Sequence, residues 1–595
     1  MQNILKSVKR IFLSKHCVIR FIMAWCFVSI TYILGTLLAG KNLVANLKAQ
    51  ESIEILWLLI LLAAVFAGLN IFFENIKNEK FEKMCLFFLS LVFCAVSIVM
   101  KQDMYFAAGL TLLMTFCTIY CLDGIELDRV KVDGKSLKII LAISALLFVL
   151  FASACGICRY FSYSTPNFDF GIFSQMFYYM KNTFTMNTTC ERDMLMSHMN
   201  VHVSPVYWLI LPFYAVFSSP VTLQFMQAFV IALGIIPLYF ICRKHKFTRF
   251  ETMLFGVCYF AYPVMSGGTF YDMHENMFLP AALLCLLLAM EYDSAWGIAV
   301  SAVFVLGIKE DAAVYAAFVA LYMIFGRKMY KKGSAMFAVS VIYFVLAVMY
   351  LNTSGQGTLT GRFNNMIYEN DGNVFGMLKT IIISPSYFLT QVMSEKNLKF
   401  IIQVLSPLLF MPLLTKKWPR FILFGPLVLF NLMPDYQYGK NIFFQYVFGS
   451  GTLLLYAALL NVKDLTKQRC TKTLVMMLIS SVFFFLSLNL GQTRYISRYF
   501  DTDNAKLYQS MNEQLKLIPQ DASVKATAFL CPNLSNRRYL YELAYSDEET
   551  DYVVIDLRDS TDYKKRDEDV ENYKNDERYE ITYEKDKEMI IFKRK

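Results

Sequence analysis

The sequence predicts a polytopic α-helical membrane protein with about fifteen transmembrane helices, followed by a small soluble α/β domain. Apolar residues make up 56% of the chain and charged residues 17%, whereas soluble domains average roughly 45–50% and 25%. The apolar residues form blocks of about 18–24, the length that crosses about 30 Å of hydrocarbon as a helix. Lys and Arg gather in short clusters between these blocks, as they do in cytoplasmic loops.

The net charge of +10 does not indicate a nucleic-acid partner, because the basic residues occupy positions that orient membrane spans. The segment Met1–Lys15 is basic, and about 24 apolar residues follow it without a small-residue cleavage site. We therefore expect a retained membrane anchor with its N-terminus in the cytoplasm.

The chain divides into three parts. Residues 1–136 hold four spans, and residues 137–490 form a transmembrane core with external loops at 159–219 and 267–276. In the first loop, residues 205–217 are apolar but too short to cross, so we expect a helix along the membrane surface. The core also includes predicted spans near 398–414 and 418–433.

From about residue 491 the composition becomes charged and polar. Residues 504–517 are predicted to form a helix, and 561–578 a solvated loop. Strands are predicted at 523–530 and 552–557, with a hairpin at 579–583 and 588–593. Residues 491–595 are thus expected to form an extracytoplasmic α/β domain.

Asp169 lies just beyond the outer end of the fifth span, between Phe168 and Phe170. Burial among aromatic side chains raises the pKa of a carboxyl group, which suits a general base or acid. The alternative is that Asp169 caps the helix expected from residue 170 onward.

The turn between two later spans carries Asp272, His274 and Glu275. Three ionisable groups within four residues exceed what a connection requires, and ionisable groups at membrane depth are functional candidates. The alternative is a plain solvated turn.

His198 and His202 are spaced so that they share one face if the segment is helical. Together with Asp272, His274 or Glu275 they could hold a metal ion. Contact with a substrate phosphate or hydroxyl group, or simple hydrogen bonding, are the alternatives.

A third polar turn, Lys309-Glu310-Asp311, interrupts two short apolar helices. Lys309 could bind a phosphate group with Glu310 beside it. Alternatively, Asp311 caps the returning helix and Lys309 pairs locally. Arg362 and Tyr436 lie near the outer ends of later spans and could contact a donor head group.

These motifs, with segments of the C-terminal part, resemble the bacterial and archaeal membrane-protein family known as domain of unknown function 2079. The segments that carry the resemblance are Asn167–Gln175, His202–Pro205, Tyr271–Glu275, Lys309–Ala313, Ile518–Ser523, Leu534–Tyr539 and Asp551–Asp556. The resemblance runs from about residue 140 to 560. An acidic neighbour expected before His202 is absent, since Val201 stands there.

That family is similar to the GT-C superfamily of integral-membrane glycosyltransferases, which take sugars from polyprenyl-phosphate carriers and invert the anomeric centre. The resemblance implies that Asp169 is the general base and that Asp272 or Glu275 is the second acidic residue. It also implies that Lys309 neutralises the developing phosphate charge. The acceptor would be a cell-envelope glycan or protein outside a bacterial plasma membrane.

The sequence leaves open whether the protein uses a metal cofactor and which class of function it has. Some members of the superfamily use a divalent cation, so Mg²⁺ or Mn²⁺ held by Asp169, His202 and Asp272 is one alternative and no cofactor is the other. A transporter or flippase for a lipid-linked glycan, or a non-catalytic scaffold, would also be multi-pass proteins of this kind.

Overall fold

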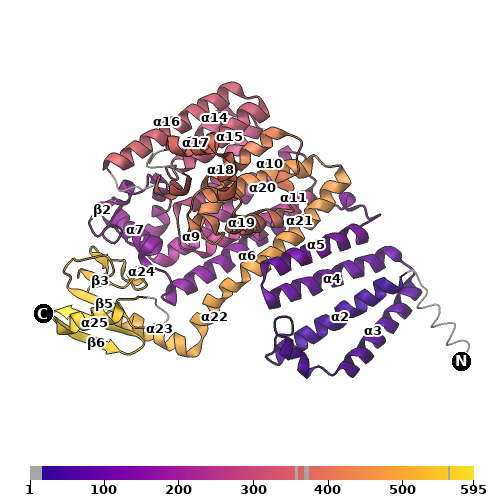
Figure 1. Cartoon of the computed structure of the whole chain (residues 1–595), viewed down its shortest axis with the longest axis horizontal. Coiled ribbons are helices and arrows are strands. Elements are labelled where there is room, and N and C mark those ends of the chain that lie inside the picture. The colour runs from indigo at the N-terminus through magenta and orange to yellow at the C-terminus, as the bar shows by residue number, and fades with distance from the viewer. Residues whose placement is uncertain (1–15, 355–359, 367–373, 560–562) are drawn as a thin grey trace, which may run out of the picture.

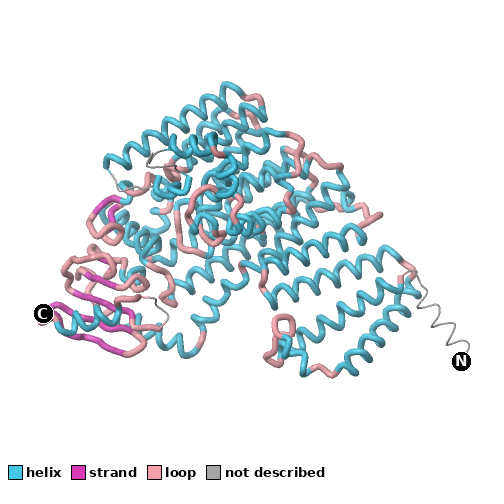
Figure 2. Tube along the Cα trace, viewed as in Figure 1, coloured by secondary structure: helices cyan, strands magenta, loops and turns pink. Residues whose placement is uncertain are grey.

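The computed structural model describes residues 16–354, 360–366, 374–559 and 563–595. It consists of an N-terminal group of helices, a large helical core and a C-terminal domain beside one end of that core (Figure 1). Nearly all regular structure in the first two parts is helical, and most strands lie in the third (Figure 2).

The N-terminal group contains α2 (Cys17–Leu38), α3 (Ile55–Ile76), α4 (Glu79–Lys101) and α5 (Met104–Cys121). It joins the core through α21 (Lys467–Leu488), since Ile479 and Phe483 of α21 are buried in one apolar cluster with α4 and α5. Within the group, the buried Arg20 pairs with Glu82 at 2.8 Å. Burial of a charge requires such a partner.

The core is built from helices between residues 134 and 488. They are α6 (Gly134–Phe161), α9 (Pro220–Leu233), α10 (Ile235–Lys244), α11 (Arg249–Ala261), α12 (Pro263–Gly267), α13 (Leu279–Glu291), α14 (Ala295–Leu306), α15 (Ala312–Arg327), α16 (Tyr330–Ser354), α17 (Val374–Ile383), α18 (Pro385–Val392), α19 (Glu395–Leu405), α20 (Phe448–Lys463) and α21. The most buried of them is α20, whose residues Phe448 to Val462 are all buried.

Nine helices among the described residues are long and apolar enough to cross a membrane, or ten if the bent pair Arg249–Ala261 and Pro263–Phe270 is one span. The remaining predicted crossings fall on shorter or broken helices. The segments predicted to span near 398–414 and 418–433 are instead α19 followed by 3-10 and π turns. Four prolines explain the difference, because proline cannot continue a helix: Pro407, Pro412, Pro419 and Pro426.

The long loop after α6 carries η3 (Asn167–Gly171), α7 (Ile172–Thr183), the short strands β1 (Asn187–Thr188) and β2 (Met196–Ser197), η5 (Pro205–Leu209) and α8 (Leu211–Val216). The segment expected to lie along the membrane surface is therefore two short helices, neither long enough to cross.

The C-terminal part begins with α22 (Arg494–Phe500) and α23 (Thr502–Leu515) and continues with β3 (Val524–Ala526), α24 (Cys531–Leu534), β4 (Leu540–Glu542), β5 (Tyr552–Asp556), α25 (Arg566–Asn575), β6 (Tyr579–Lys585) and β7 (Met589–Arg594). The strands form one sheet in the order β4-β3-β5-β7-β6, in which β3 is parallel to β4 and β5 while β7 is antiparallel to its neighbours. The predicted helix, the strand at β5 and the hairpin are confirmed.

Two expectations for this part were wrong. The segment 523–530 is a strand only as far as Ala526, and the following residues turn into α24. The segment predicted as a solvated loop contains α25, which buries no residue. Its composition is therefore that of an exposed helix.

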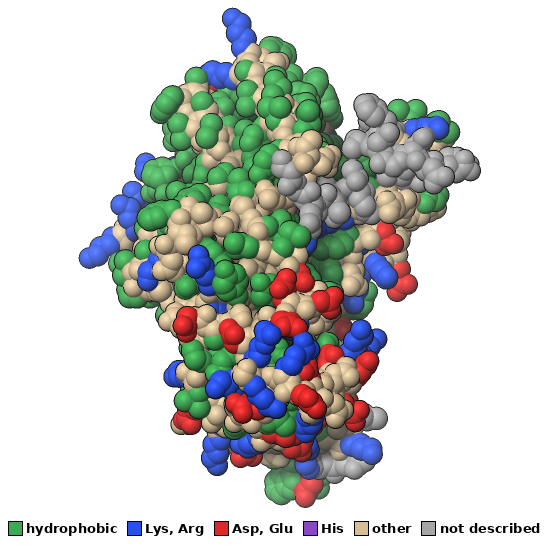
Figure 3. Space-filling model, turned by 90° about the vertical axis from the view of Figure 1, so that its left-hand side faces the viewer, with side chains coloured by type: hydrophobic (Ala, Val, Ile, Leu, Met, Phe, Trp, Pro, Cys, Tyr) green, Lys and Arg blue, Asp and Glu red, His purple; other side chains and the backbone are tan. Residues whose placement is uncertain are grey.

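The C-terminal domain is docked on the long loop. Arg558 donates hydrogen bonds to the carbonyl oxygens of Ser162 (3.1 Å) and Tyr163 (2.9 Å) and pairs with Asp556. Tyr179 of α7 donates to the carbonyl oxygen of Arg538 at 2.6 Å. Seen from this end, the charged surface of the domain stands below an apolar upper surface (Figure 3).

Candidate active site

Three turns meet at the end of the core where the C-terminal domain docks. The first is η3 with the loop that follows α7, the second joins α12 to α13, and the third joins α14 to α15. Phe173 of α7 holds the first two together, because its ring lies 5.3 Å from the ring of His198 and 5.3 Å from the ring of His274.

Asp169 has an unusual backbone conformation, with φ 71° and ψ −72°. This is the region of a γ-turn, which is strained for a residue other than glycine. Asn167 fixes the turn, since its side chain donates to the carbonyl oxygen of Cys190 (2.9 Å) and to Glu542 of the C-terminal domain (2.8 Å). Gly171 leaves room for this side chain, because a Cβ at position 171 would collide with Asn167 Oδ1 and displace it.

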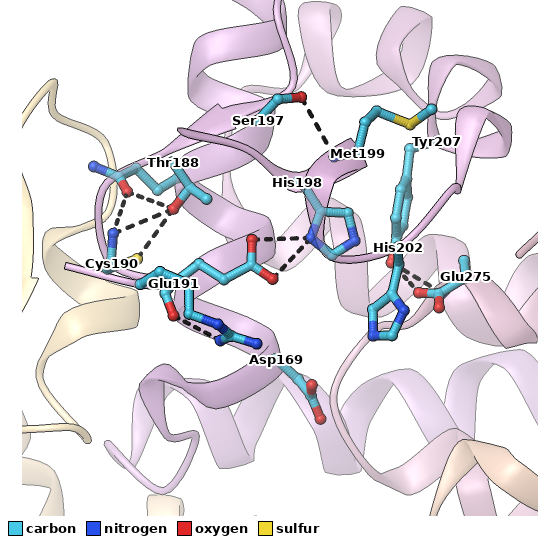
Figure 4. A network of polar contacts seen from close by, with 12 residues as sticks. Asp169, Thr188, Cys190, Glu191, Ser197, His198, Met199, His202, Tyr207 and Glu275 are labelled. Atoms are coloured by element: carbon cyan, nitrogen blue, oxygen red, sulfur yellow. Dashed lines mark hydrogen bonds and ion pairs between the residues drawn. The ribbon is translucent and has the colours of Figure 1, made fainter. Parts of the chain in front are cut away.

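The Asp169 side chain is 30% exposed. It does not cap α7, which starts at Ile172 with Gly171 in the cap position and no side-chain cap bond. His274 lies beside it, with its Nε2 4.0 Å from Asp169 Oδ1. Figure 4 shows the carboxylate apart from the hydrogen-bonded pairs around it.

Glu275 is fully buried and is held by three side chains. Tyr207 Oη donates to Oε2 at 2.5 Å, His274 Nδ1 lies 2.8 Å from Oε2, and Lys309 Nζ lies 2.9 Å from Oε1. Burial alone would raise the pKa of Glu275, but His274 and Lys309 outweigh it and hold that pKa well below its usual range. The carboxylate therefore stays ionised and fixes Lys309 in place.

Asp272 is also fully buried, and its partner is Arg159 near the end of α6, with Nη1 2.6 Å from Oδ1. Gln224 donates to the same oxygen at 3.2 Å. The guanidinium lies 4.8 Å from the centre of the Tyr271 ring. Burial raises the pKa of Asp272 to about 6, although Arg159 opposes the shift.

Two further histidines form separate pairs with glutamates. His202 Nδ1 lies 2.9 Å from Glu310 Oε1, and Glu310 also accepts from the backbone N–H of Val203 at 3.0 Å. His198 Nδ1 lies 3.1 Å from both oxygens of Glu191. The Glu191 carboxylate raises the pKa of His198 despite the opposing effect of burial.

The third turn differs from the alternative in which Lys309 pairs locally. Lys309 pairs with the distant Glu275 rather than locally, and Glu310 pairs with His202. Asp311 occupies the cap position of α15 but makes no side-chain cap bond.

Arg362 and Tyr436 lie together at the edge of the site. The Arg362 guanidinium is 4.2 Å from the centre of the Tyr436 ring and 5.2 Å from that of Tyr446. The two tyrosine hydroxyl groups are 3.1 Å apart.

The side chains present do not fit a metal ion. In the parts of the chain that the structure describes, no group of three or more His, Cys, Asp or Glu side chains is arranged to hold one. His202 and Asp272 are engaged by Glu310 and Arg159 instead.

Sequence reasoning missed Arg159, Tyr207 and Glu191. Arg159 offered a signal, because a charged residue near the end of an apolar span requires a buried partner. Tyr207 offered none, since a tyrosine at a membrane surface is ordinary.

Comparison with known proteins finds a matching family and similar structures. The family model described as "Predicted membrane protein (DUF2079)" matches residues 159–590. The structure is similar to that of ArnT from Cupriavidus metallidurans bound to undecaprenyl phosphate, with a TM-score of 0.51 and 10% identity over 77% of this chain and 98% of that chain. The apo state of ArnT gives a TM-score of 0.45 with 11% identity over 75% and 98%. No curated protein sequence matches.

At this identity the likeness concerns the fold alone, and it confirms the predicted GT-C-like architecture. The family model covers well over half of the sequence, which confirms the resemblance seen in the motifs. The chain belongs to the DUF2079 family of predicted membrane proteins.

Proposed function

We propose that this protein is an integral-membrane glycosyltransferase that moves a sugar from a polyprenyl-phosphate carrier to an acceptor hydroxyl group, with inversion. The fold supports the proposal, because the similar ArnT structure contains undecaprenyl phosphate. The acceptor is a glycan or protein of the cell envelope, and the membrane is the bacterial plasma membrane with the site on its outer side.

The proposal rests on one observation, which is that three acidic residues differ in burial and in ion pairing. Asp272 and Glu275 are fully buried and paired with Arg159 and Lys309. Asp169 is partly exposed and held in a strained turn. Strained backbone at a pocket is a common mark of a functional group. Of the three, Asp169 is the one that an acceptor can reach.

In the proposed reaction, Asp169 accepts the proton of the acceptor hydroxyl as its oxygen attacks the anomeric carbon. The bond between that carbon and the phosphate oxygen breaks, and both bonding electrons leave with the polyprenyl phosphate. A phosphate leaving group needs no strong acid, but it gains negative charge. Lys309 and Arg362 are the cations placed to stabilise this charge.

Asp272 and Glu275 act on the reaction through their partners. Glu275 fixes Lys309 and His274, and Asp272 fixes Arg159. His198, His202 and Glu310 hold the loop that carries this network.

The test is to incubate membranes containing the full chain with radiolabelled polyprenyl-phosphate sugars and measure the release of unglycosylated polyprenyl phosphate. A glycosyltransferase releases the carrier phosphate as sugar enters the acceptor fraction. Movement of labelled lipid between leaflets without release would identify a transporter and would refute the proposal.

A further inference from the structure

A polar cavity lies at the opposite end of the core from the candidate active site. Its volume is about 370 Å³, and it lies between the ends of α10, α15 and α20. Because α15 has 16 residues, the cavity is roughly 24 Å from the Lys309 turn along that helix. It takes no part in the proposed reaction.

The charged residues that line the cavity are mostly basic: His245, Arg327, Lys417, Arg420, Lys463 and Asp464. Arg420 is buried and pairs with Asp464 at 2.6 Å, while Arg327 pairs with Glu291 at 3.0 Å. Four permanent cations therefore face two carboxylates. The cavity keeps a positive excess that attracts an anion.

Lys463 is the cation that the surrounding protein leaves without a carboxylate. Its Nζ donates to the carbonyl oxygen of Lys246 at 2.9 Å and lies 4.6 Å from the centre of the Phe247 ring. In the described part of the chain it makes no ion pair. Lys417 shares Asp464 with Arg420, so one carboxylate serves two cations.

Two exposed aromatic residues lie next to cavity-lining residues in the sequence. Trp418 directly follows Lys417 and is 62% exposed, and Phe325 lies two residues before Arg327 and is 52% exposed. Their ring centres are 5.9 Å apart. Large exposed aromatic side chains beside basic residues are typical of a helix end at the membrane interface.

We propose that this cavity binds the phosphate head group of an anionic membrane lipid. The cations contact the phosphate oxygens, and the lipid chains lie against Trp418 and Phe325. A soluble phosphate would gain nothing from the exposed rings, whereas a lipid fits both the charge and the apolar border. Basic pockets between membrane helices bind lipid head groups for these reasons.

The test uses the purified full chain in a neutral detergent, with phosphatidylglycerol and phosphatidylcholine as probes and native mass spectrometry as the readout. We expect phosphatidylglycerol to bind in preference to phosphatidylcholine. Each cation removed, Lys417→Gln or Lys463→Gln, should lower the apparent affinity roughly fivefold. We expect both variants to fold, because Arg420 keeps its pair with Asp464.

Lys416→Gln is the matched control, since Lys416 is exposed in the same turn but does not line the cavity. The proposal would be overturned by equal binding of the two lipids, by unchanged phosphatidylglycerol binding in both Lys417→Gln and Lys463→Gln, or by an equal loss in the control. Inorganic phosphate that competes as effectively as the lipid would overturn the assignment to a lipid. None of these results depends on glycosyl transfer.

Discussion

Arg159 and Asp272 form a buried ion pair 2.6 Å long between residues 113 positions apart in the sequence. The pair ties the end of α6 to the turn before α13. It also orients the Tyr271 ring, over which the guanidinium lies. The pair therefore ties the second of the three turns of the candidate active site to the helix that leads into the first.

Replacing one partner of this pair should cost far more stability than replacing both. Arg159→Met leaves the Asp272 carboxylate buried without a cation, which costs about 3–5 kcal/mol. The double variant Arg159→Met/Asp272→Asn should recover a large part of that loss. Thermal unfolding in detergent measures the stability of the single and the double variant. Equal destabilisation of the two would show that Arg159 and Asp272 do not depend on each other for their contribution to stability.

The hydroxyl of Tyr207 should contribute measurably to folding. Tyr207→Phe removes its hydrogen bonds with the Glu275 carboxylate and backbone N–H, so about 1–3 kcal/mol of unfolding free energy should be lost. Tyr214→Phe is the matched control, since Tyr214 is equally buried and its hydroxyl makes no hydrogen bond within the described residues. Similar losses in both variants would contradict this contribution.

The pair of His198 and Glu191 predicts a pH dependence of stability. The pKa of His198 is raised above 6.5, so its contribution is complete below pH 6.5 and is lost as the pH rises through the raised value. The pKa of Glu191 is lowered below 4.5, so its contribution is complete above pH 4.5 and is lost as the pH falls through the lowered value. The pair stabilises most fully between these limits.

Unfolding temperatures measured from pH 6 to pH 9 test this expectation. The natural protein should lose on the order of 1–3 kcal/mol over that range relative to Glu191→Gln. Parallel curves for the two proteins would show that the ion pair does not form.

Docking of the C-terminal domain should depend on Arg558. Arg558→Gln removes the bonds to the Ser162 and Tyr163 carbonyl oxygens and leaves the buried Asp556 without its cation. Amide hydrogen exchange in the loop 162–190 should rise by at least tenfold, because the loop loses its covering. Arg578→Gln, an exposed change within the same domain, should leave the exchange as it is.

Much of this architecture follows from the sequence, because apolar blocks and basic clusters are local signals. Asp169, Asp272 and Glu275 could be selected by residue type and position alone. Their different environments could not be predicted, because each buried carboxylate depends on a distant partner. That partner is Arg159 for Asp272 and Lys309 for Glu275. The breaks in the helices after α19 could have been predicted from the prolines. The apolar composition of these segments instead suggested unbroken membrane spans.

The backbone conformation of Asp169 could not be predicted from the sequence either. Its γ-turn depends on Asn167, which is held by Glu542 from the other end of the chain. A local pattern suggests a helix cap at this position, and only the docked domain explains why the chain turns instead.

The proposed role of Asp169 is tested most directly by Asp169→Asn in the full chain. We measure sugar transfer and carrier-phosphate release together with the unfolding temperature. We predict a rate reduced by about 10²–10⁴ with an unchanged unfolding temperature, since the Asp169 carboxylate is partly exposed and makes no hydrogen bond to the residues that the structure describes. Transfer at the natural rate by a folded Asp169→Asn protein would contradict this role.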